Sequence, residues 1–98
     1  MQFVIYAKDK LDNLAHRMEV RPTHLDYWGE NGESVVLAGP LLDLDEKPCG
    51  STLILEADSL ADARALAEGD PYWKEGVFGS LEVTATNMFL GKLAPAAD

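Results

Sequence analysis

Two residues of this sequence have side chains suited to moving a proton, and each lies close to a proline. His24 follows Pro22 by two positions, and Asp70 directly precedes Pro71. Histidine exchanges protons near neutral pH, and a carboxylate partner would orient one of its ring nitrogens, so His24 is a candidate general acid or base. The alternative is a partly exposed helix histidine with no role in chemistry. The residues alone leave both interpretations open.

Asp70 also has a structural interpretation. An aspartate before a proline at a helix end can stabilise a turn through its own side chain. A negative charge at a helix C-terminus opposes the helix dipole at a cost of about 0.3–1 kcal/mol. A functional or hydrogen-bonding role for Asp70 would explain why the residue is there.

Half of the basic residues of an acidic chain lie together before His24. The segment contains Lys8, Lys10, Arg17 and Arg21 beside Asp9, Asp12 and Glu19. A guanidinium group can bind a carboxylate through two parallel hydrogen bonds. We therefore expect Arg17 or Arg21 to face a site for a small anionic molecule together with His24. A solvated helix face is the alternative.

Three hydroxyl groups, those of Tyr6, Ser51 and Tyr72, are candidates for the lining of such a site. Tyrosines on strands and turns more often serve packing, and Ser51 has no sequence partner that would make it a nucleophile. The sequence contains no strong metal-ligand spacing and no glycine-rich phosphate loop at the start of a helix. We expect neither a metal nor a cofactor.

Composition narrows the class of protein. The 98 residues include 8 Lys plus Arg and 17 Asp plus Glu, for a net charge of -9. Such a charge disfavours nucleic acid and anionic lipid as partners. The N-terminal sequence lacks the features of a signal peptide, no apolar run is long enough to span a bilayer, and Cys49 is a single cysteine. We expect a cytoplasmic protein.

Hydrophobic periodicity predicts two successive strand–helix–strand units. We expect strands at 2–7, 35–38, 51–57 and 81–90, separated by a loop at 41–48. We expect a helix at 11–20 that breaks at Arg21-Pro22 and resumes to Gly29, and a second helix that begins after the N-cap Ser59 and stops at Gly69. Residues 1–93 form the expected single domain, and 94–98 form a tail.

These elements predict a ferredoxin-like α+β fold. Right-handed crossovers place both helices on one face of a four-stranded antiparallel sheet. The other face would expose apolar side chains, so we expect it to pair with a second copy in a homodimer.

Five ordered motifs resemble those of the YciI-like (YCII-related) family. They are the N-terminal MQFVIYAKDK, the Arg-Pro-x-His of residues 21–24, the Ala-Gly-Pro of 38–40, the Gly-Ser of 50–51, and Asp-Pro-Tyr at 70–72 followed by Gly-Val at 76–77. The match spans roughly residues 1 to 90. The resemblance implies a dimeric α+β barrel of ferredoxin-like protomers, with His24 and Asp70 at the centre of an active site.

Related proteins include a dehydrochlorinase acting on a chlorinated hydroxyquinol, and muconolactone isomerases share the barrel. The resemblance thus implies cofactor-independent lyase or isomerase chemistry on a small ring or lactone, with Asp70 fixing the His24 tautomer. The short 41–48 loop departs from relatives that carry a longer glycine-rich insertion, which makes substrate identity the least transferable property. Two alternatives stay open: a non-catalytic ligand-binding or accessory dimer, and a haem- or oxygen-dependent monooxygenase like other dimeric barrels. A His24–Asp70 hydrogen bond lining a concave pocket would favour the enzyme.

Overall fold

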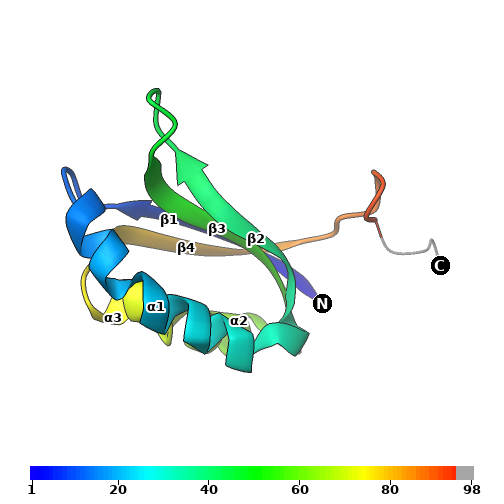
Figure 1. The fold of residues 1–98 in the computed structure, drawn as a ribbon. Coiled ribbons are helices and arrows are strands. Elements are labelled where there is room, and N and C mark those ends of the chain that lie inside the picture. Colours follow the sequence, from blue (N-terminus) through cyan, green and yellow to red (C-terminus); the bar gives the residue numbers. More distant parts are fainter. Residues whose placement is uncertain (95–98) are drawn as a thin grey trace.

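The computed structural model describes residues 1–94, in which one sheet carries its helices on a single face (Figure 1). The elements are β1 (Gln2–Asp9), α1 (Leu14–Glu30), a 3₁₀ turn (Gly32–Ser34), β2 (Val35–Leu42), β3 (Pro48–Glu56), α2 (Leu60–Glu68), α3 (Pro71–Lys74) and β4 (Phe78–Thr86). The strand order is β2-β3-β1-β4, and all neighbouring strands are antiparallel. The predicted ferredoxin-like α+β fold is confirmed. Of the predicted 94–98 tail, only Ala94 lies within the described residues.

Alternation along the central strands builds the core beneath the helices. In β1 the buried residues are Phe3, Ile5 and Ala7, and in β3 they include Leu53 and Leu55. Side chains two positions apart point to the same face of a sheet, so these residues form one apolar surface. The small residues Ala63 and Ala67 of α2 pack on this surface, with Trp28 of α1 beside them.

The first helix differs from the prediction. The expected break at Arg21-Pro22 is wrong, because α1 is a single helix with Pro22 inside it. A proline within a helix removes one backbone hydrogen bond and costs about 3 kcal/mol. Buried side chains before and after it, Val20 and Trp28, hold both halves of α1 against the rest of the protein. Packing therefore overrides the local preference, and His24 lies in the middle of a continuous helix.

The second crossover contains an unpredicted helix. After α2 stops at Gly69, the chain enters the short α3, whose N-cap is Asp70 and whose first residue is Pro71. The Asp70 side chain accepts a hydrogen bond from the Tyr72 backbone N–H at 2.9 Å. The expectation that this carboxylate opposes a helix dipole is incomplete, because Asp70 also lies at the favourable N-terminal end of α3.

The observed bounds of the two edge strands, β2 and β4, differ from the predicted ones. Gly39-Pro40 does not end β2, which continues to Leu42, so the connection to β3 is a hairpin turn over 43–47. An edge strand tolerates proline because one row of its backbone groups needs no partner, and β2 is an edge strand. The last strand runs over Phe78–Thr86 instead of 81–90.

The helix-free face of the sheet carries apolar side chains from three neighbouring strands. Ile54 of β3 pairs with Val4 of β1 on one side and with Leu37 of β2 on the other. Tyr6 lies on the same face, and its exposed fraction is 44%, against 57% for Leu37. This apolar group lies on the face that the sequence assigns to a second copy.

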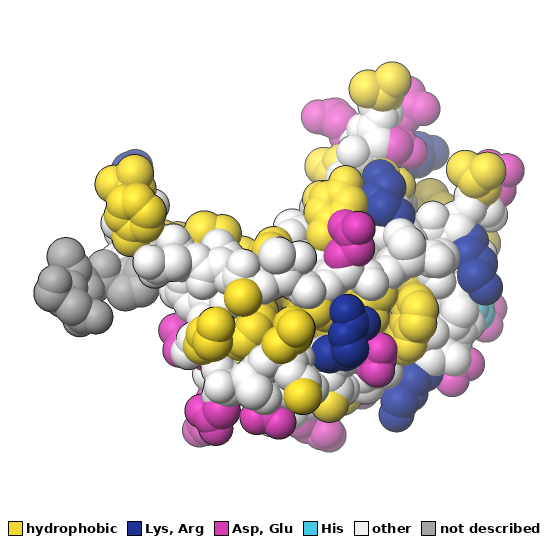
Figure 2. Space-filling model, turned by 180° about the vertical axis from the view of Figure 1, so that it is seen from behind, with side chains coloured by type: hydrophobic (Ala, Val, Ile, Leu, Met, Phe, Trp, Pro, Cys, Tyr) yellow, Lys and Arg dark blue, Asp and Glu magenta, His cyan; other side chains and the backbone are white. Residues whose placement is uncertain are grey.

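Beyond β4 the chain leaves the body of the protein. Figures 1 and 2 show residues 87–94 as an arm that stands apart from the sheet. Its side chains Met88, Phe89, Leu90 and Leu93 are exposed. No helix among residues 1–94 is long and apolar enough to cross a membrane.

We predict that the chain is a homodimer held by the helix-free face. Ile54→Asp should yield monomers, because it places a charge at the centre of the apolar group. Light scattering at micromolar concentration measures the mass. Leu60→Asp, at an exposed position in the first turn of α2, is the matched control and should stay dimeric. A monomeric mass for the unmodified chain would contradict this assembly.

Candidate active site

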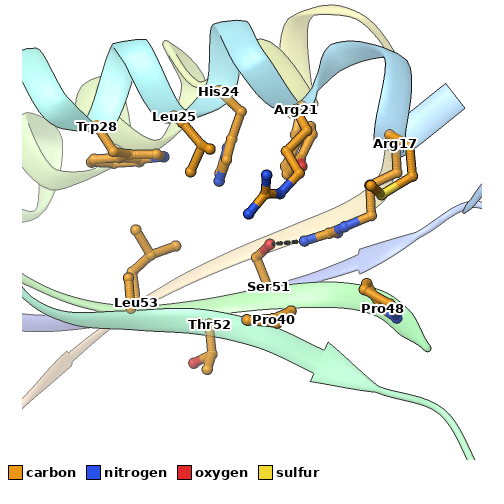
Figure 3. A pocket seen from close by; sticks show the side chains of 14 residues that line it. Arg17, Arg21, His24, Leu25, Trp28, Pro40, Pro48, Ser51, Thr52 and Leu53 are labelled. Atoms are coloured by element: carbon orange, nitrogen blue, oxygen red, sulfur yellow. Dashed lines mark hydrogen bonds between the residues drawn. The ribbon is translucent and has the colours of Figure 1, made fainter. Parts of the chain in front are cut away.

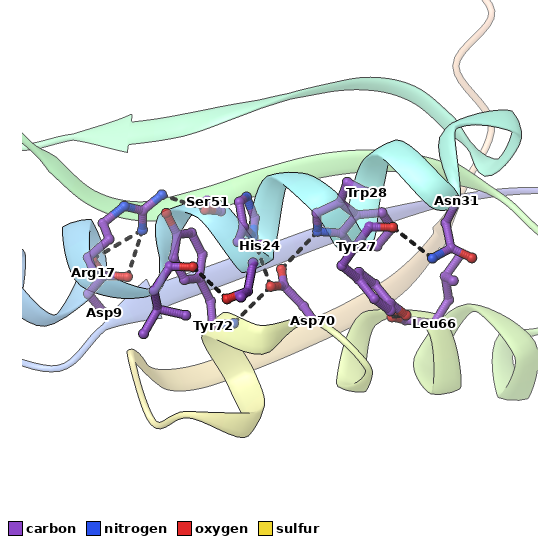
Figure 4. A network of polar contacts seen from close by, with 12 residues as sticks. Asp9, Arg17, His24, Tyr27, Trp28, Asn31, Ser51, Leu66, Asp70 and Tyr72 are labelled. Atoms are coloured by element: carbon purple, nitrogen blue, oxygen red, sulfur yellow. Dashed lines mark hydrogen bonds and ion pairs between the residues drawn. The ribbon is translucent and has the colours of Figure 1, made fainter.

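The site begins with a hydrogen bond between two distant parts of the sequence. His24 Nδ1 lies 2.8 Å from Asp70 Oδ1, and the two residues are 46 positions apart (Figure 4). A carboxylate accepts hydrogen bonds and does not donate them, so Nδ1 carries the proton. The ring atom Nε2 has no hydrogen-bond partner among residues 1–94. In a neutral imidazole held this way, Nε2 presents a lone pair.

Helix lengths explain how the two residues meet. At 1.5 Å per residue, the 17 residues of α1 extend about 25 Å and the nine of α2 about 13 Å. The end of α2 lies beside the later part of α1, where the Tyr27 hydroxyl donates to the Leu66 carbonyl. Asp70 follows directly and faces the middle of α1.

Asp70 is almost fully buried, with 1% of its surface exposed. Oδ1 accepts from His24 and from the Tyr72 backbone, and Oδ2 accepts from the Trp28 indole Nε1 at 2.9 Å. A buried carboxylate is tolerated when hydrogen-bond donors compensate it. These contacts supply that compensation from two helices.

The Tyr72 ring connects the histidine to an arginine. It stacks on the His24 ring with centroids 3.8 Å apart, and the Arg17 guanidinium carbon lies 4.5 Å from its centre. Figure 4 draws the Tyr72 ring between the two side chains. Burial raises the pKa of Tyr72, so its hydroxyl stays protonated at neutral pH.

Arg17 is itself buried and already paired. Its Nη1 donates to both carboxylate oxygens of Asp9, at 2.9 and 3.1 Å, and its Nη2 donates to Ser51 Oγ at 2.8 Å. Burial raises the pKa of Asp9 although the adjacent Arg17 guanidinium lowers it. The positive charge of Arg17 is thus balanced within the protein.

A cavity of about 480 Å³ lies between α1 and the β2–β3 edge of the sheet. One face of α1 lines it with Arg17, Met18, Arg21, His24, Leu25 and Trp28. Figure 3 shows arginines and Ser51 toward one end, Trp28, Leu25 and Leu53 toward the other, and His24 between them. The guanidinium of Arg21 points toward Ser51 in the same view. Arg21 has no ion pair among residues 1–94, so its charge is available to a ligand.

Most of the candidate residues meet at this cavity. Arg17, Arg21, His24, Ser51 and Tyr72 all line it, and Asp70 holds His24 from behind. Tyr6, which was expected there as well, does not line this cavity. Strand alternation places it on the helix-free face, opposite the buried neighbours Ile5 and Ala7.

Two residues that contact the site were missed by the sequence reasoning. Asp9 was assigned to a mixed charge cluster, and its pairing with Arg17 depends on how β1 and α1 pack. Trp28 is not among the candidate residues of the sequence analysis, and its spacing of four residues from His24 is the one sequence signal that places both on the same face of α1.

Comparison with known proteins identifies the family. The model of the YCII-related domain matches residues 1–87. The chain belongs to the YCII-related family. Protein YciI of Escherichia coli O6:H1 is 39% identical over 92 residues, covering 85% of this chain and 93% of that protein. An uncharacterized protein of Haemophilus influenzae is 34% identical over the same length and coverage.

A solved structure agrees with this assignment. The chain is similar to 5-chloro-2-hydroxyhydroquinone dehydrochlorinase (TftG) of Burkholderia phenoliruptrix in complex with 2,5-dihydroxybenzoquinone. The two share 31% identity and a TM-score of 0.84, over 97% of this chain and 100% of the other. The chain therefore shares its fold with a solved protein of similar sequence.

The raised pKa values of two tyrosines lead us to predict that the protein loses stability at alkaline pH. Burial raises the pKa of Tyr27 and of Tyr72. Asp70 adds to the rise for Tyr27, whereas the nearby Arg17 and Arg21 oppose it for Tyr72 without reversing it. In the unfolded chain both ionise at about pH 10, so above that pH the unfolded state binds fewer protons and the free energy of unfolding falls. Urea unfolding at pH 9 to 11 measures the fall. Tyr72→Phe should reduce it, whereas Tyr6→Phe should leave it close to the original. An equal fall in both variants would contradict the assignment to Tyr72.

Proposed function

We propose that the protein is an enzyme of lyase or isomerase type in which His24 exchanges a proton with a small anionic compound that is cyclic or unsaturated. One observation carries the proposal: a buried carboxylate holds His24 Nδ1 at 2.8 Å, and the ring lines a cavity through its other side. A base in this position can accept a proton at Nε2 and return it. The activity named for TftG supports the lyase class.

In the elimination, His24 Nε2 takes a proton from the substrate. The step acts on the keto tautomer of the ring, in which the carbon that carries chlorine is saturated. The electron pair of the broken bond then moves into the ring to form a double bond to that carbon, and chloride departs with the electron pair of its own bond. The imidazolium then gives its proton to solvent, so the net loss from a chlorinated ring is hydrogen chloride. In an isomerisation, the same imidazolium returns the proton to a different atom. Asp70 stabilises the transient imidazolium in both cases.

Arg21 is the residue that we assign to anion binding. Arg17 forms an ion pair with Asp9, whereas Arg21 lines the cavity without an ion pair among residues 1–94. A guanidinium next to the developing negative charge also stabilises an enolate or phenolate formed when the proton leaves. The apolar end at Leu25, Trp28 and Leu53 suits the flat body of a ring.

Dehydrochlorination tests the dyad. With 5-chloro-2-hydroxyhydroquinone as probe, we expect chloride release that His24→Ala abolishes and that Asp70→Asn lowers about tenfold or more. Because the two residues act as one unit, the double variant should be little worse than His24→Ala alone. His16→Gln is the matched control, since His16 lies outside the cavity lining and contacts the Glu75 carbonyl.

The outcomes separate the classes of function. If the chain binds the probe but releases no chloride, and promotes no deuterium exchange into enolisable ring compounds, it is a binding module instead of an enzyme. Additive effects of the two single substitutions would contradict the dyad.

Arg21 gives a separate prediction on ligand charge. We expect Arg21→Gln to weaken binding of 2,5-dihydroxybenzoquinone about tenfold or more, because one charge-assisted contact of roughly 1.5–3 kcal/mol is lost. The neutral dimethyl ether of this quinone should bind Arg21→Gln almost as well as it binds the unmodified chain. The matched control is Arg64→Gln, which removes the same charge from an exposed pair with Glu68. Isothermal calorimetry measures the affinities. An equal loss of affinity for both ligands, or in both variants, would show that Arg21 does not select the anion.

A further inference from the structure

The indole of Trp28 contacts the site at an atom that no other described side chain reaches. Trp28 Nε1 donates to Asp70 Oδ2 at 2.9 Å, whereas His24 and the Tyr72 backbone both contact Oδ1. Within residues 1–94, Trp28 is thus the one donor to Oδ2. Trp28 is 9% exposed and Asp70 1%, so water has little access to this contact.

Loss of the indole N–H would leave a buried carboxylate oxygen without a donor. Such an oxygen carries the full cost of its lost hydration, which favours rotation of the carboxylate toward other donors. Rotation about the Cβ–Cγ bond would move Oδ1 away from His24. The indole N–H opposes this rotation because it holds the second oxygen.

Trp28 and His24 reach the carboxylate from the same rigid element. They are four residues apart on α1, which places their side chains on one face of the helix. From this geometry we infer that Trp28 is a positioning residue: its N–H fixes the rotation of Asp70 and, through it, the Nδ1-protonated form of His24. In that form Nε2 is unprotonated on the cavity side.

The other histidine of the chain supplies an internal reference. His16 Nε2 lies 2.7 Å from the backbone carbonyl of Glu75. A carbonyl oxygen only accepts, so His16 carries its proton on Nε2. The structure therefore assigns opposite tautomers to the two histidines of the sequence.

Nitrogen NMR of the full chain tests the inference without a substrate. With ¹⁵N-labelled histidine, at a pH where both rings are neutral, we expect an Nδ1-protonated His24 and an Nε2-protonated His16. In Trp28→Phe the two ¹⁵N shifts of His24 should move toward each other, because the Nε2-protonated form becomes populated. His16 should not change.

A second replacement removes only the donor. Replacement of Trp28 by 3-benzothienylalanine keeps the size of the ring and lacks the N–H, so it covers the case in which Trp28→Phe does not fold. It should reproduce the shift of the His24 signals. Trp73→Phe is the matched control, because the Trp73 ring lies outside the cavity lining and makes no hydrogen bond to Asp70 among residues 1–94.

An unchanged His24 tautomer in the benzothienylalanine protein would overturn the role of Trp28. That result would leave the proposed reaction standing, since chloride release tests His24 and Asp70 directly. Conversely, the unmodified chain could be inactive in the chloride-release and deuterium-exchange assays while the benzothienylalanine protein shows the expected tautomer shift. That result would overturn the proposed reaction and support the positioning role of Trp28.

Discussion

The buried carboxylate of Asp70 is the constraint on which the rest of the site depends. A charge removed from water must find hydrogen-bond donors in the protein, and a buried charge without them is strongly destabilising. Asp70 obtains them from His24, Trp28 and the Tyr72 backbone. The carboxylate therefore joins the middle of α1 to the start of α3, and the position of His24 is a consequence of that junction.

A second buried pair orders the other end of the cavity. Asp9 at the end of β1 binds Arg17 at the end of the first turn of α1, and Arg17 donates to Ser51 of β3 and lies over the Tyr72 ring. The two carboxylates thus anchor the same face of α1 at positions two helical turns apart. Arg21 lies between these anchors and pairs with neither carboxylate, so within residues 1–94 it places a positive charge without an ion pair at the cavity beside His24.

The two faces of the sheet carry residues with different surroundings. The face toward the helices supplies Ser51 and Leu53 to the cavity, and the opposite face carries Tyr6 and Ile54. Because strand side chains alternate, residues that follow one another in β3 serve the site and the helix-free surface in turn. A change of Tyr6 or Ile54 on the helix-free face therefore alters a surface that is separate from Ser51 and Leu53 of the cavity.

Local pattern by itself determined the order along the chain of the four strands and of helices α1 and α2, although not α3. It also determined the N-cap at Ser59, whose side chain accepts from the Asp62 N–H as expected. Motif resemblance supplied the family and the residues His24 and Asp70. These features depend on neighbours in sequence or on ordered motifs, and both can be read from one chain.

Only the tertiary structure decided the rest, because the deciding energies come from contacts between distant segments. Pro22 breaks isolated helices, yet burial of Val20 and Trp28 keeps α1 continuous. Tyr6 could be assigned to the cavity because the phase of a strand that is apolar on both sides is undefined until its partners are placed. Charge alone could not distinguish Arg17 from Arg21, since the distinction is a buried partner, Asp9, on another element. The Trp28 contact with Asp70 likewise exists only once α1 and α3 are packed together.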